Sequence, residues 1–438
     1  MKETIFSRLE AQEENALSLL RRLIAHESVA SPSGKATDTR GTPLGNCLSD
    51  ALDAARELGL FAKNLDGVAL IIDTSETEDA KIGILCHLDV VPAGDGWTHP
   101  PFAGEIEDGR LYGRGATDDK GPFVSALLAV AALKACGKEL RYPIRLIAGT
   151  CEETGSADLA YCKERGVIPK IVFSPDASYP VINTEKGICR FSISAPFPQT
   201  SCIASLSGGE VINMVPQRAV ARFKDGTLTQ AHGHAAHAST PELGENAITK
   251  LLFSLADTLK DDASYELLHA SCRLHPPHET NGFSLGIAAC EPIAGELTCS
   301  LDLMELKDDT LKLSFDVRYP LNVTEESLKD ALTKRLSDTP FTLGDMTVMP
   351  PHHVPADSPL VKCLLNAYTS VTGQKGYTAA MGGGTYVHDI EGGVAFGTVF
   401  PEEDCRIHSP DEFIPVKALV ENAKIFATAL LLLQDETL

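Results

Sequence analysis

Two kinds of apolar pattern alternate along the first part of the chain. Four short, continuously apolar runs are typical of buried strands and lie at 68–72, 82–86, 144–148 and 171–174. Three longer segments carry apolar residues at helical spacing and lie at 9–24, 44–60 and 122–136. Because strands that alternate with helices usually form a sheet covered on both faces, we predict an α/β domain with a mostly parallel sheet.

The pattern changes after about residue 180. Apolar and polar residues alternate, as in half-buried strands, at 187–195, 202–207, 219–223 and 311–317, and a helical segment lies at 244–260. The first pattern then returns with a helix at 359–372, a buried strand at 393–399 and a helix at 416–433. A chain of 438 residues is long enough for two domains. We therefore predict a discontinuous α/β domain, residues 1–180 and 350–438, with an α+β domain inserted at 181–349.

The end of the predicted strand 82–86 carries the first chemical signal. His87 and Asp89 lie two residues apart, and such side chains point the same way in an extended chain. Asp89 is then placed to orient the imidazole, as carboxylates near metal-binding histidines commonly do. A solvated His and Asp at a strand end would give the same pattern, so the prediction depends on the motifs that follow.

Further acidic residues and a second histidine come after other predicted strands and loops. They are Asp118-Asp119, Glu152-Glu153, Asp176 and His408. The carboxyl ends of strands in an open α/β sheet are where ligands bind. With His87, one residue from each motif gives five ligands, which suits two metal ions that share one carboxylate. Oxygen and nitrogen ligands favour Zn²⁺, Mn²⁺ or Co²⁺. Of the pair Glu152-Glu153, the glutamate that does not bind metal would be free to accept a proton from water.

Composition excludes some classes of partner. A formal net charge of −22 argues against nucleic acid and anionic membrane surfaces, and no apolar run reaches membrane-spanning length. The twelve cysteines include no C-x-x-C pair, and the N-terminal segment is charged and amphipathic rather than a signal peptide. We expect a cytoplasmic protein with reduced thiols.

The ordered motifs resemble those of the M20 family of metallopeptidases. The resemblance spans nearly the whole chain and is carried by His87-Leu88-Asp89, the Arg-Gly-x-x-Asp-x-Lys-Gly run at 114–121, Glu152-Glu153 and His408. Within the family, the run at 113–122, the Gly-Gly-Gly-Thr-Tyr segment at 382–386 and the long insert are similar to PepV-type bacterial dipeptidases. Cys151 and the Arg406-Ile407 pair depart from the more usual family context, which bears on substrate preference more than on catalysis.

The resemblance implies a role for each residue of the motifs. The implied ligands are His87 and Asp176 for one ion, Glu153 and His408 for the other, and Asp118 as the bridge. Glu152 would act as general base and then general acid, and Asp89 would orient the His87 ring. A cis peptide between Asp118 and Asp119 is also implied.

The inserted domain would act as a lid that contributes to substrate binding. By resemblance, His237 in the Ala-His-Ala-Ser motif would stabilise the oxyanion, and Arg318 would bind the carboxylate of the substrate. Gly383, Gly384 and Thr385 lie in what resembles the substrate loop of the family. Because the insert is large, we expect His237 to act within its own chain and the protein to be a monomer.

The resemblance therefore implies hydrolysis of short peptides, chiefly dipeptides, by a water that bridges two divalent ions, with Zn²⁺ expected and Mn²⁺ or Co²⁺ as alternatives. One competing hypothesis keeps the chemistry but makes the substrate an N-acyl-amino acid or succinyl-diaminopimelate. Another is a non-catalytic binding protein, which the intact ligand set and Glu152 oppose.

Overall fold

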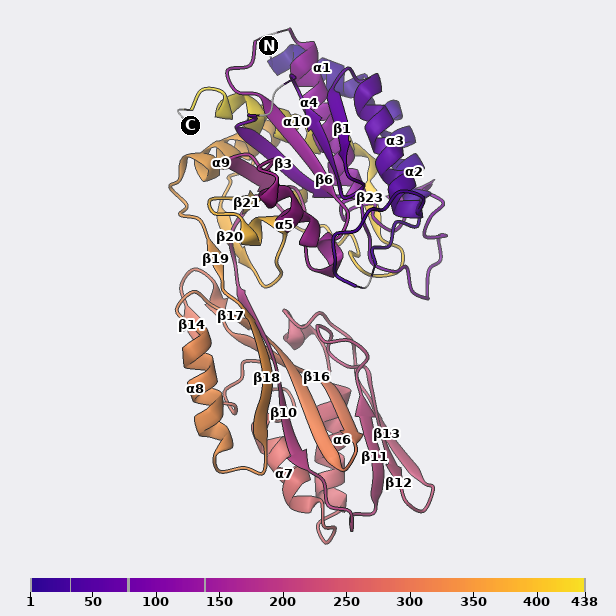
Figure 1. The fold of residues 1–438 in the computed structure, drawn as a ribbon, viewed down its shortest axis with the longest axis vertical. Coiled ribbons are helices and arrows are strands. Elements are labelled where there is room, and N and C mark those ends of the chain that lie inside the picture. Colours follow the sequence, from indigo (N-terminus) through magenta and orange to yellow (C-terminus); the bar gives the residue numbers. More distant parts are fainter. Residues whose placement is uncertain (1, 32, 77–78, 138, 437–438) are drawn as a thin grey trace. The chain divides into compact units, whose positions relative to one another are not determined.

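The chain folds into two compact units. The computed structural model describes residues 2–31, 33–76, 79–137 and 139–436 (Figure 1). Unit 1 consists of Met1–Asn183, Val354–Ala379 and Thr385–Leu438, and unit 2 consists of Thr184–His353 and Ala380–Gly384. The unit boundaries lie a few residues beyond those predicted at 180 and 349, and the short return of 380–384 to unit 2 was not anticipated.

The first sheet has nine strands and is mixed rather than mostly parallel. In spatial order its strands are β1 (Phe61–Leu65), β2 (Ala69–Asp73), β6 (Ile144–Gly149), β3 (Ile82–His87), β7 (Ile171–Ser174), β21 (Val394–Ala395), β9 (Val181–Glu185) and β19 (His352–His353), and β20 (Thr378–Met381) pairs with β9. The central pairs β6–β3, β3–β7 and β7–β21 are parallel, whereas β1–β2, β2–β6, β21–β9 and β9–β19 are antiparallel. The prediction of a mostly parallel sheet is wrong at its flanks, because β1 and β2 form a hairpin and β9 returns antiparallel to β21.

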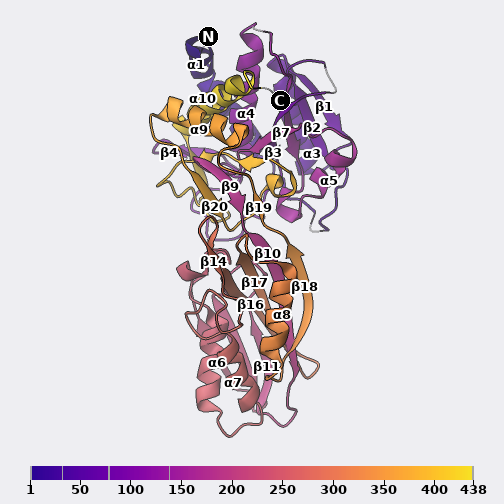
Figure 2. The same ribbon diagram turned by 90° about the vertical axis from the view of Figure 1, so that its left-hand side faces the viewer.

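Helices cover both faces of this sheet, as predicted. They are α1 (Lys2–Glu10), α2 (Glu13–Ile24), α3 (Pro43–Glu57), α4 (Lys120–Ala135), α5 (Ala157–Glu164), α9 (Pro359–Thr372) and α10 (Val416–Leu433). The connection from β3 through α4 to β6 and the one from β6 through α5 to β7 run in opposite directions across the sheet. Right-handed crossovers therefore put α4 and α5 on opposite faces, as Figures 1 and 2 show.

The predicted elements of unit 1 agree closely with the structure. The four buried strands are β2, β3, β6 and β7, each within one residue of its predicted bounds. The segment predicted as one helix at 9–24 is two helices, because the chain turns at Ala11 and Gln12. The predicted strand at 393–399 is broken into β21 and β22 (Thr398–Val399) around Gly397, whose φ of +85° no regular strand contains.

Small elements carry the loops around the carboxyl ends of the strands. They are β4 (Glu105–Glu107), β5 (Arg110–Tyr112) and β23 (Phe413–Pro415), which form a three-stranded sheet, β8 (Ala177–Ser178), which pairs with β22, and the 3₁₀ turns η1 (Glu152–Thr154) and η3 (Tyr386–Asp389). Glu152 and Glu153 thus lie in a single tight turn directly after β6, which fixes their spacing from the strand end.

Unit 2 is a two-layer α+β domain built on an antiparallel sheet. Its seven strands are, in spatial order, β13 (Leu228–His232), β12 (Arg218–Phe223), β11 (Ile203–Gly208), β16 (Thr298–Lys307), β17 (Thr310–Tyr319), β10 (Gly187–Pro196) and β18 (Thr342–Met349). The remaining elements are α6 (Ala247–Thr258), α7 (Tyr265–Leu274), α8 (Glu325–Leu336), η2 (Pro241–Leu243), β14 (Cys290–Glu291) and β15 (Gly295–Glu296). Apolar side chains of the helices and of the sheet form one core.

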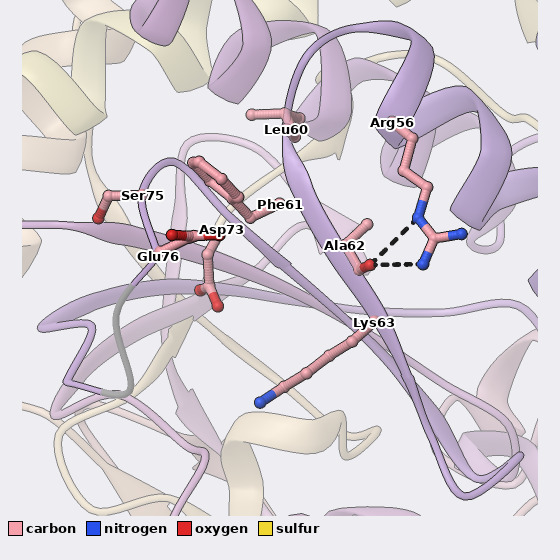
Figure 3. A pocket seen from close by; sticks show the side chains of 8 residues that line it. All are labelled: Arg56, Leu60, Phe61, Ala62, Lys63, Asp73, Ser75 and Glu76. Carbon is pink, nitrogen blue, oxygen red and sulfur yellow. Dashed lines mark hydrogen bonds between the residues drawn. The ribbon is translucent and has the colours of Figure 1, made fainter.

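An open hollow lies at the edge strand β1, away from the predicted site residues (Figure 3). Arg56 donates to the Ala62 carbonyl from Nε at 3.3 Å and from Nη2 at 3.1 Å, which ties the end of α3 to this strand. Phe61 is 42% exposed there. The hollow contains none of the candidate ligands, so it is separate from the site described next. None of the helices in the described part of the chain combines the length and apolar character of a membrane span.

Candidate metal centre

The five predicted ligands converge in unit 1, where Asp118 lies between the two histidines. Its Oδ1 is 2.9 Å from Nε2 of His87, and its Oδ2 is 2.8 Å from Nε2 of His408. His408 Nε2 is also 2.9 Å from Oε1 of Glu153, and His87 Nε2 is 3.8 Å from Oδ2 of Asp176. One carboxylate therefore faces two imidazoles with a different oxygen for each, which is the geometry of a bridging ligand.

Local folding explains how these side chains meet. His87 ends β3, Glu153 lies in η1 after β6, and Asp176 follows β7, so three neighbouring parallel strands deliver ligands to one edge. Asp118 comes from the loop before α4, and its peptide bond to Asp119 is cis, as the resemblance implied. His408 has φ of +59°, a left-handed conformation that is uncommon outside glycine and that is often found at functional sites.

The buried polar atoms fit a pair of divalent metal ions. His87 Nε2 and Asp118 Oδ1 are buried, and although they lie 2.9 Å apart, neither has hydrogen-bond geometry with a described residue. Buried polar atoms without partners are costly, and atoms that ligate a metal are spared that cost. Ligand atoms of His87 lie within 4.8 Å of those of Asp118 and Glu153 in one group, and of Glu152 and Asp176 in another. The His87 side chain is 1% exposed and that of His408 is 43% exposed, so the centre is buried on one side and open on the other.

Without metal, the carboxylates of the cluster repel one another. Burial and the charge of Asp118 raise the pKa of Asp176 to about 8, and burial followed by the charge of Asp176 raises the pKa of Glu152. Burial lowers the pKa of His408, but Asp118 and Glu153 outweigh it and raise the value to about 11. The metal-free cluster therefore holds extra protons, which divalent cations would displace.

The loop that carries the two glutamates is held by carboxylates. Asp89 accepts hydrogen bonds from the backbone N–H groups of Glu152 and Glu153, both at 3.2 Å. Asp89 also contacts the His87 ring, but the closest atom to Nδ1 is its backbone carbonyl at 2.9 Å, whereas its carboxylate is 3.5 Å away. The backbone carbonyl of Asp89 is therefore the main contact that orients the His87 ring. The carboxylate of Asp89 mainly holds the loop of Glu152 and Glu153.

The loop that carries Asp118 is held by Glu412, which the sequence analysis did not identify. Glu412 is fully buried, and its carboxylate accepts from the backbone N–H groups of Gly115 (3.2 Å), Thr117 (2.9 Å) and Asp118 (3.1 Å). Arg114 Nη1 donates to the same carboxylate at 2.7 Å. Because Glu412 lies four residues after His408, it links the Asp118 loop to the loop of the second histidine. The only sequence signal for it was an acidic residue after His408, which is too common to stand out.

The predicted lid residues lie in unit 2, except for Thr385. His237 is exposed, and its Nδ1 accepts from the backbone N–H of Ser239 at 3.2 Å. Arg318 is 2% exposed, and it donates from Nε and Nη2 to the two carboxylate oxygens of Asp316 and from Nη1 to the Gly382 carbonyl at 2.6 Å. Arg318 is thus paired with a buried acid. Three contacts leave two of its five N–H groups for a ligand.

The glycine-rich segment crosses from one unit to the other. Gly383 and Gly384 belong to unit 2 and Thr385 to unit 1. Thr385 is the N-cap of η3, where its hydroxyl accepts from the backbone N–H of Val387 at 3.3 Å. This contact gives Thr385 a structural role at the start of the turn.

Comparison with known proteins gives consistent matches over nearly the whole chain. Residues 83–432 match the profile of peptidase family M20/M25/M40. The chain is 34% identical to putative dipeptidase YtjP of Bacillus subtilis over 428 residues, which cover 89% of this chain and 91% of the relative. It is 31% identical to the Beta-Ala-Xaa dipeptidase of Lactobacillus delbrueckii subsp. lactis over 471 residues, which cover 98% of each. The fold is similar to that of human carnosine dipeptidase 1, with a TM-score of 0.64, 18% identity and 99% of each chain covered.

Proposed function

The chain belongs to peptidase family M20/M25/M40, and on that premise we propose that it hydrolyses the peptide bond of dipeptides with the help of two divalent metal ions. The observation that carries the proposal is the Asp118 carboxylate, which offers one oxygen toward His87 and the other toward His408. The names of the relatives, a putative dipeptidase and a Beta-Ala-Xaa dipeptidase, support dipeptides as the substrate class.

The ligand set supports Zn²⁺, with Mn²⁺ and Co²⁺ as alternatives, because all donors are imidazole nitrogens or carboxylate oxygens. His87 and Asp176 would hold one ion, Glu153 and His408 the other, and Asp118 both. When bound, the two ions would supply the positive charge that activates a water molecule and polarises the scissile carbonyl.

Glu152 is proposed as the residue that moves the proton. Burial, followed by the charge of Asp176, raises its pKa well above that of an ordinary carboxyl group, which favours proton uptake. Glu152 would accept a proton from the attacking water and then deliver it to the leaving amine. Glu153 differs from it because its Oε1 is 2.9 Å from His408 Nε2, which supports Glu153 as the ligand.

Two residues of unit 2 are proposed to bind the substrate. His237, whose Nδ1 lies 2.6 Å from the Ser239 hydroxyl and 3.2 Å from the Ser239 backbone nitrogen, would stabilise the oxyanion through its imidazole ring. Arg318 would use its remaining N–H groups for the free carboxylate of the dipeptide, and Gly383 and Gly384 would allow close approach of the loop backbone.

Glu152→Gln tests the proposed chemistry. We expect kcat on dipeptides to fall by about 10²–10⁴-fold, since general acid–base catalysis contributes that much, while the metal content stays at the wild-type value. Glu14→Gln, an exposed glutamate of α2, is the control and should change nothing. Retention of the wild-type rate would remove Glu152 from the mechanism.

The same assay distinguishes the alternative substrates. The purified protein is loaded with Zn²⁺, Mn²⁺ or Co²⁺ and tested on a dipeptide panel, on N-acyl-amino acids and on succinyl-diaminopimelate. Hydrolysis of dipeptides with the highest kcat/KM supports the proposal. A preference for acyl amino acids would make the protein a deacylase, and no hydrolysis with any metal would favour a binding protein.

We further propose that the protein is active as a monomer and that His237 serves the site of its own chain. The test mixes two inactive variants, His237→Ala and Glu152→Gln, under conditions that allow subunits to exchange. If each site is completed by residues of its own chain, the mixture of the two variants should regain no activity. Recovered activity, or an obligate dimer in light scattering at low concentration, contradicts this proposal. A reducing, cytoplasmic location is also proposed, which the twelve free cysteines support.

A further inference from the structure

A third carboxylate, Asp158, is buried beneath the loop of the two glutamates. Asp158 lies in the first turn of α5 and is 1% exposed. Its Oδ2 accepts from the backbone N–H groups of Thr150 at 2.5 Å and Cys151 at 3.0 Å. Its Oδ1 accepts from the N–H of Leu159 at 2.8 Å. Together with the two bonds to Asp89, four consecutive N–H groups of residues 150–153 donate to only two carboxylates.

Tyr386 completes the environment of Asp158. Its hydroxyl donates to Oδ2 at 2.6 Å, and the side chain is buried at the start of η3. The ring also stands edge-on to the imidazole of His87, with centroids 6.3 Å apart and an interplanar angle of 86°. A single phenol side chain therefore contacts both the carboxylate under the glutamate loop and the ring of a candidate ligand.

Gly149 shows how tightly this junction is packed. A Cβ atom at this position would lie 2.1 Å from the Tyr386 hydroxyl and 2.2 Å from Asp158 Oδ2. Any other residue at the end of β6 would push the two partners apart. Glycine is therefore required for the contact between the hydroxyl, the carboxylate and the backbone that leads to Glu152.

We propose that Tyr386 is a positioning residue for Glu152, acting through Asp158 on the backbone of Thr150 and Cys151. This inference rests on the proposed function and deepens it. The hydrogen bond from a hydroxyl to a carboxylate is short and strong, and it holds Asp158 against the two N–H groups that directly precede Glu152. Reaction rates respond to small displacements of a catalytic group, so a looser loop slows the proton transfer more than it weakens substrate binding.

Tyr386→Phe tests the inference because it removes only the hydroxyl group. We expect kcat on a dipeptide to fall by about tenfold, which corresponds to about 1.4 kcal/mol, while KM changes by less than about twofold. The number of bound metal ions should stay at the wild-type value. The matched control is Tyr368→Phe, which removes a buried hydroxyl of the same unit that donates to Gln374 at 2.8 Å. The control should keep the wild-type kcat.

Asp158→Asn provides a second, independent measurement. Both oxygens of Asp158 accept from N–H or O–H donors, so the amide nitrogen of Asn must face a donor in either orientation. We expect a larger loss of kcat than in Tyr386→Phe, and no additional loss in the double variant, because both changes break the same link. Additive losses would overturn the inference.

The remaining outcomes separate this inference from the proposed function. A wild-type enzyme without dipeptidase activity contradicts the proposed function itself. An active wild type with a Tyr386→Phe variant that behaves like Tyr368→Phe contradicts only the positioning role. Loss of bound metal, or a KM that rises as much as kcat falls, would make Tyr386 a general structural residue and would also overturn the inference.

Discussion

Replacing Glu412 by glutamine should uncouple the two loops that carry Asp118 and His408. Glutamine has the same shape as glutamate, so packing is preserved and only the charge and one acceptor oxygen are lost. Glu412 Oε2 accepts from Arg114 and Gly115, and Oε1 accepts from Thr117 and Asp118. Whichever way the amide turns, its NH₂ group faces two donors, so two hydrogen bonds are lost and the charge of Arg114 loses its partner.

The size of the effect follows from the burial of the pair. The side chains of Arg114 and Glu412 are 2% and 0% exposed. Breaking a buried ion pair by removing one partner costs about 3–5 kcal/mol, a large part of the roughly 5–15 kcal/mol that stabilises a typical domain. For a unit of this size, the midpoint of thermal unfolding should fall by about 6–20 °C. We expect the amide oxygen to stay on Arg114, so that the NH₂ group faces Thr117 and Asp118; the N–H of Asp118 then loses its acceptor, and metal affinity should fall with stability.

Urea unfolding in a chelating buffer and metal titration measure the two effects separately. Asp73→Asn is the matched control, because Asp73 pairs with Arg145 at 2.8 Å and both side chains are nearly as buried, with 8% and 2% exposed. That pair lies toward the other end of β6 from His87. The control should lose similar stability but keep metal affinity. A Glu412→Gln variant that loses less than about 1 kcal/mol, or that binds metal as tightly as Asp73→Asn, refutes the reasoning.

Three further predictions concern the ligands, the substrate and the pH dependence. Asp118→Ala should fail to retain two ions per chain, because it removes the shared ligand; two ions found by elemental analysis would contradict the bridge. Arg318→Met should lower kcat/KM for free dipeptides by about 10–100-fold and much less for C-terminally amidated ones, and equal losses would make Arg318 structural. In chelator, the free energy of unfolding should fall as pH rises from 3.8 to about 8, because the folded-state pKa of Asp176 is raised over that window and its protonated form stabilises the fold. Added Zn²⁺ should reverse this slope in urea titrations, since metal binding releases those protons, and an unchanged slope would count against the centre.

Much of the centre could be predicted because its residues follow strong local patterns. Buried parallel strands have a continuous apolar sequence, so β3, β6 and β7 and the ends that carry His87, Glu153 and Asp176 were identified within one residue. The edge strand β1 was missed because its side chains are exposed or half-buried and carry no clear period. The mixed character of the sheet was also missed, since strand direction depends on the connections and not on the apolar pattern.

The carboxylates that support the centre could not be predicted, because their partners are backbone N–H groups. Glu412 and Asp158 are acidic residues in loop or helix-start positions, where solvent exposure is the usual outcome. Their burial follows from tertiary contacts with the loops at 115–118 and 150–151, which no spacing in the sequence records. Tyr386 belonged to a recognised motif, but its partner Asp158 lies 228 residues away.

The carboxylates in and around the centre fall into two groups that differ in their hydrogen-bond partners. Asp89, Asp158 and Glu412 each accept hydrogen bonds from two or more backbone N–H groups, and Glu412 also accepts from Arg114. Glu152 and Asp176 have raised pKa values, and the cation that would stabilise their charge is the metal. The first group, Asp89, Asp158 and Glu412, holds the loops in place. The second group, Glu152 and Asp176, faces the proposed metal centre. Substitutions in the first set should therefore reduce stability even in chelator, whereas substitutions in the second set should reduce it only when metal is present.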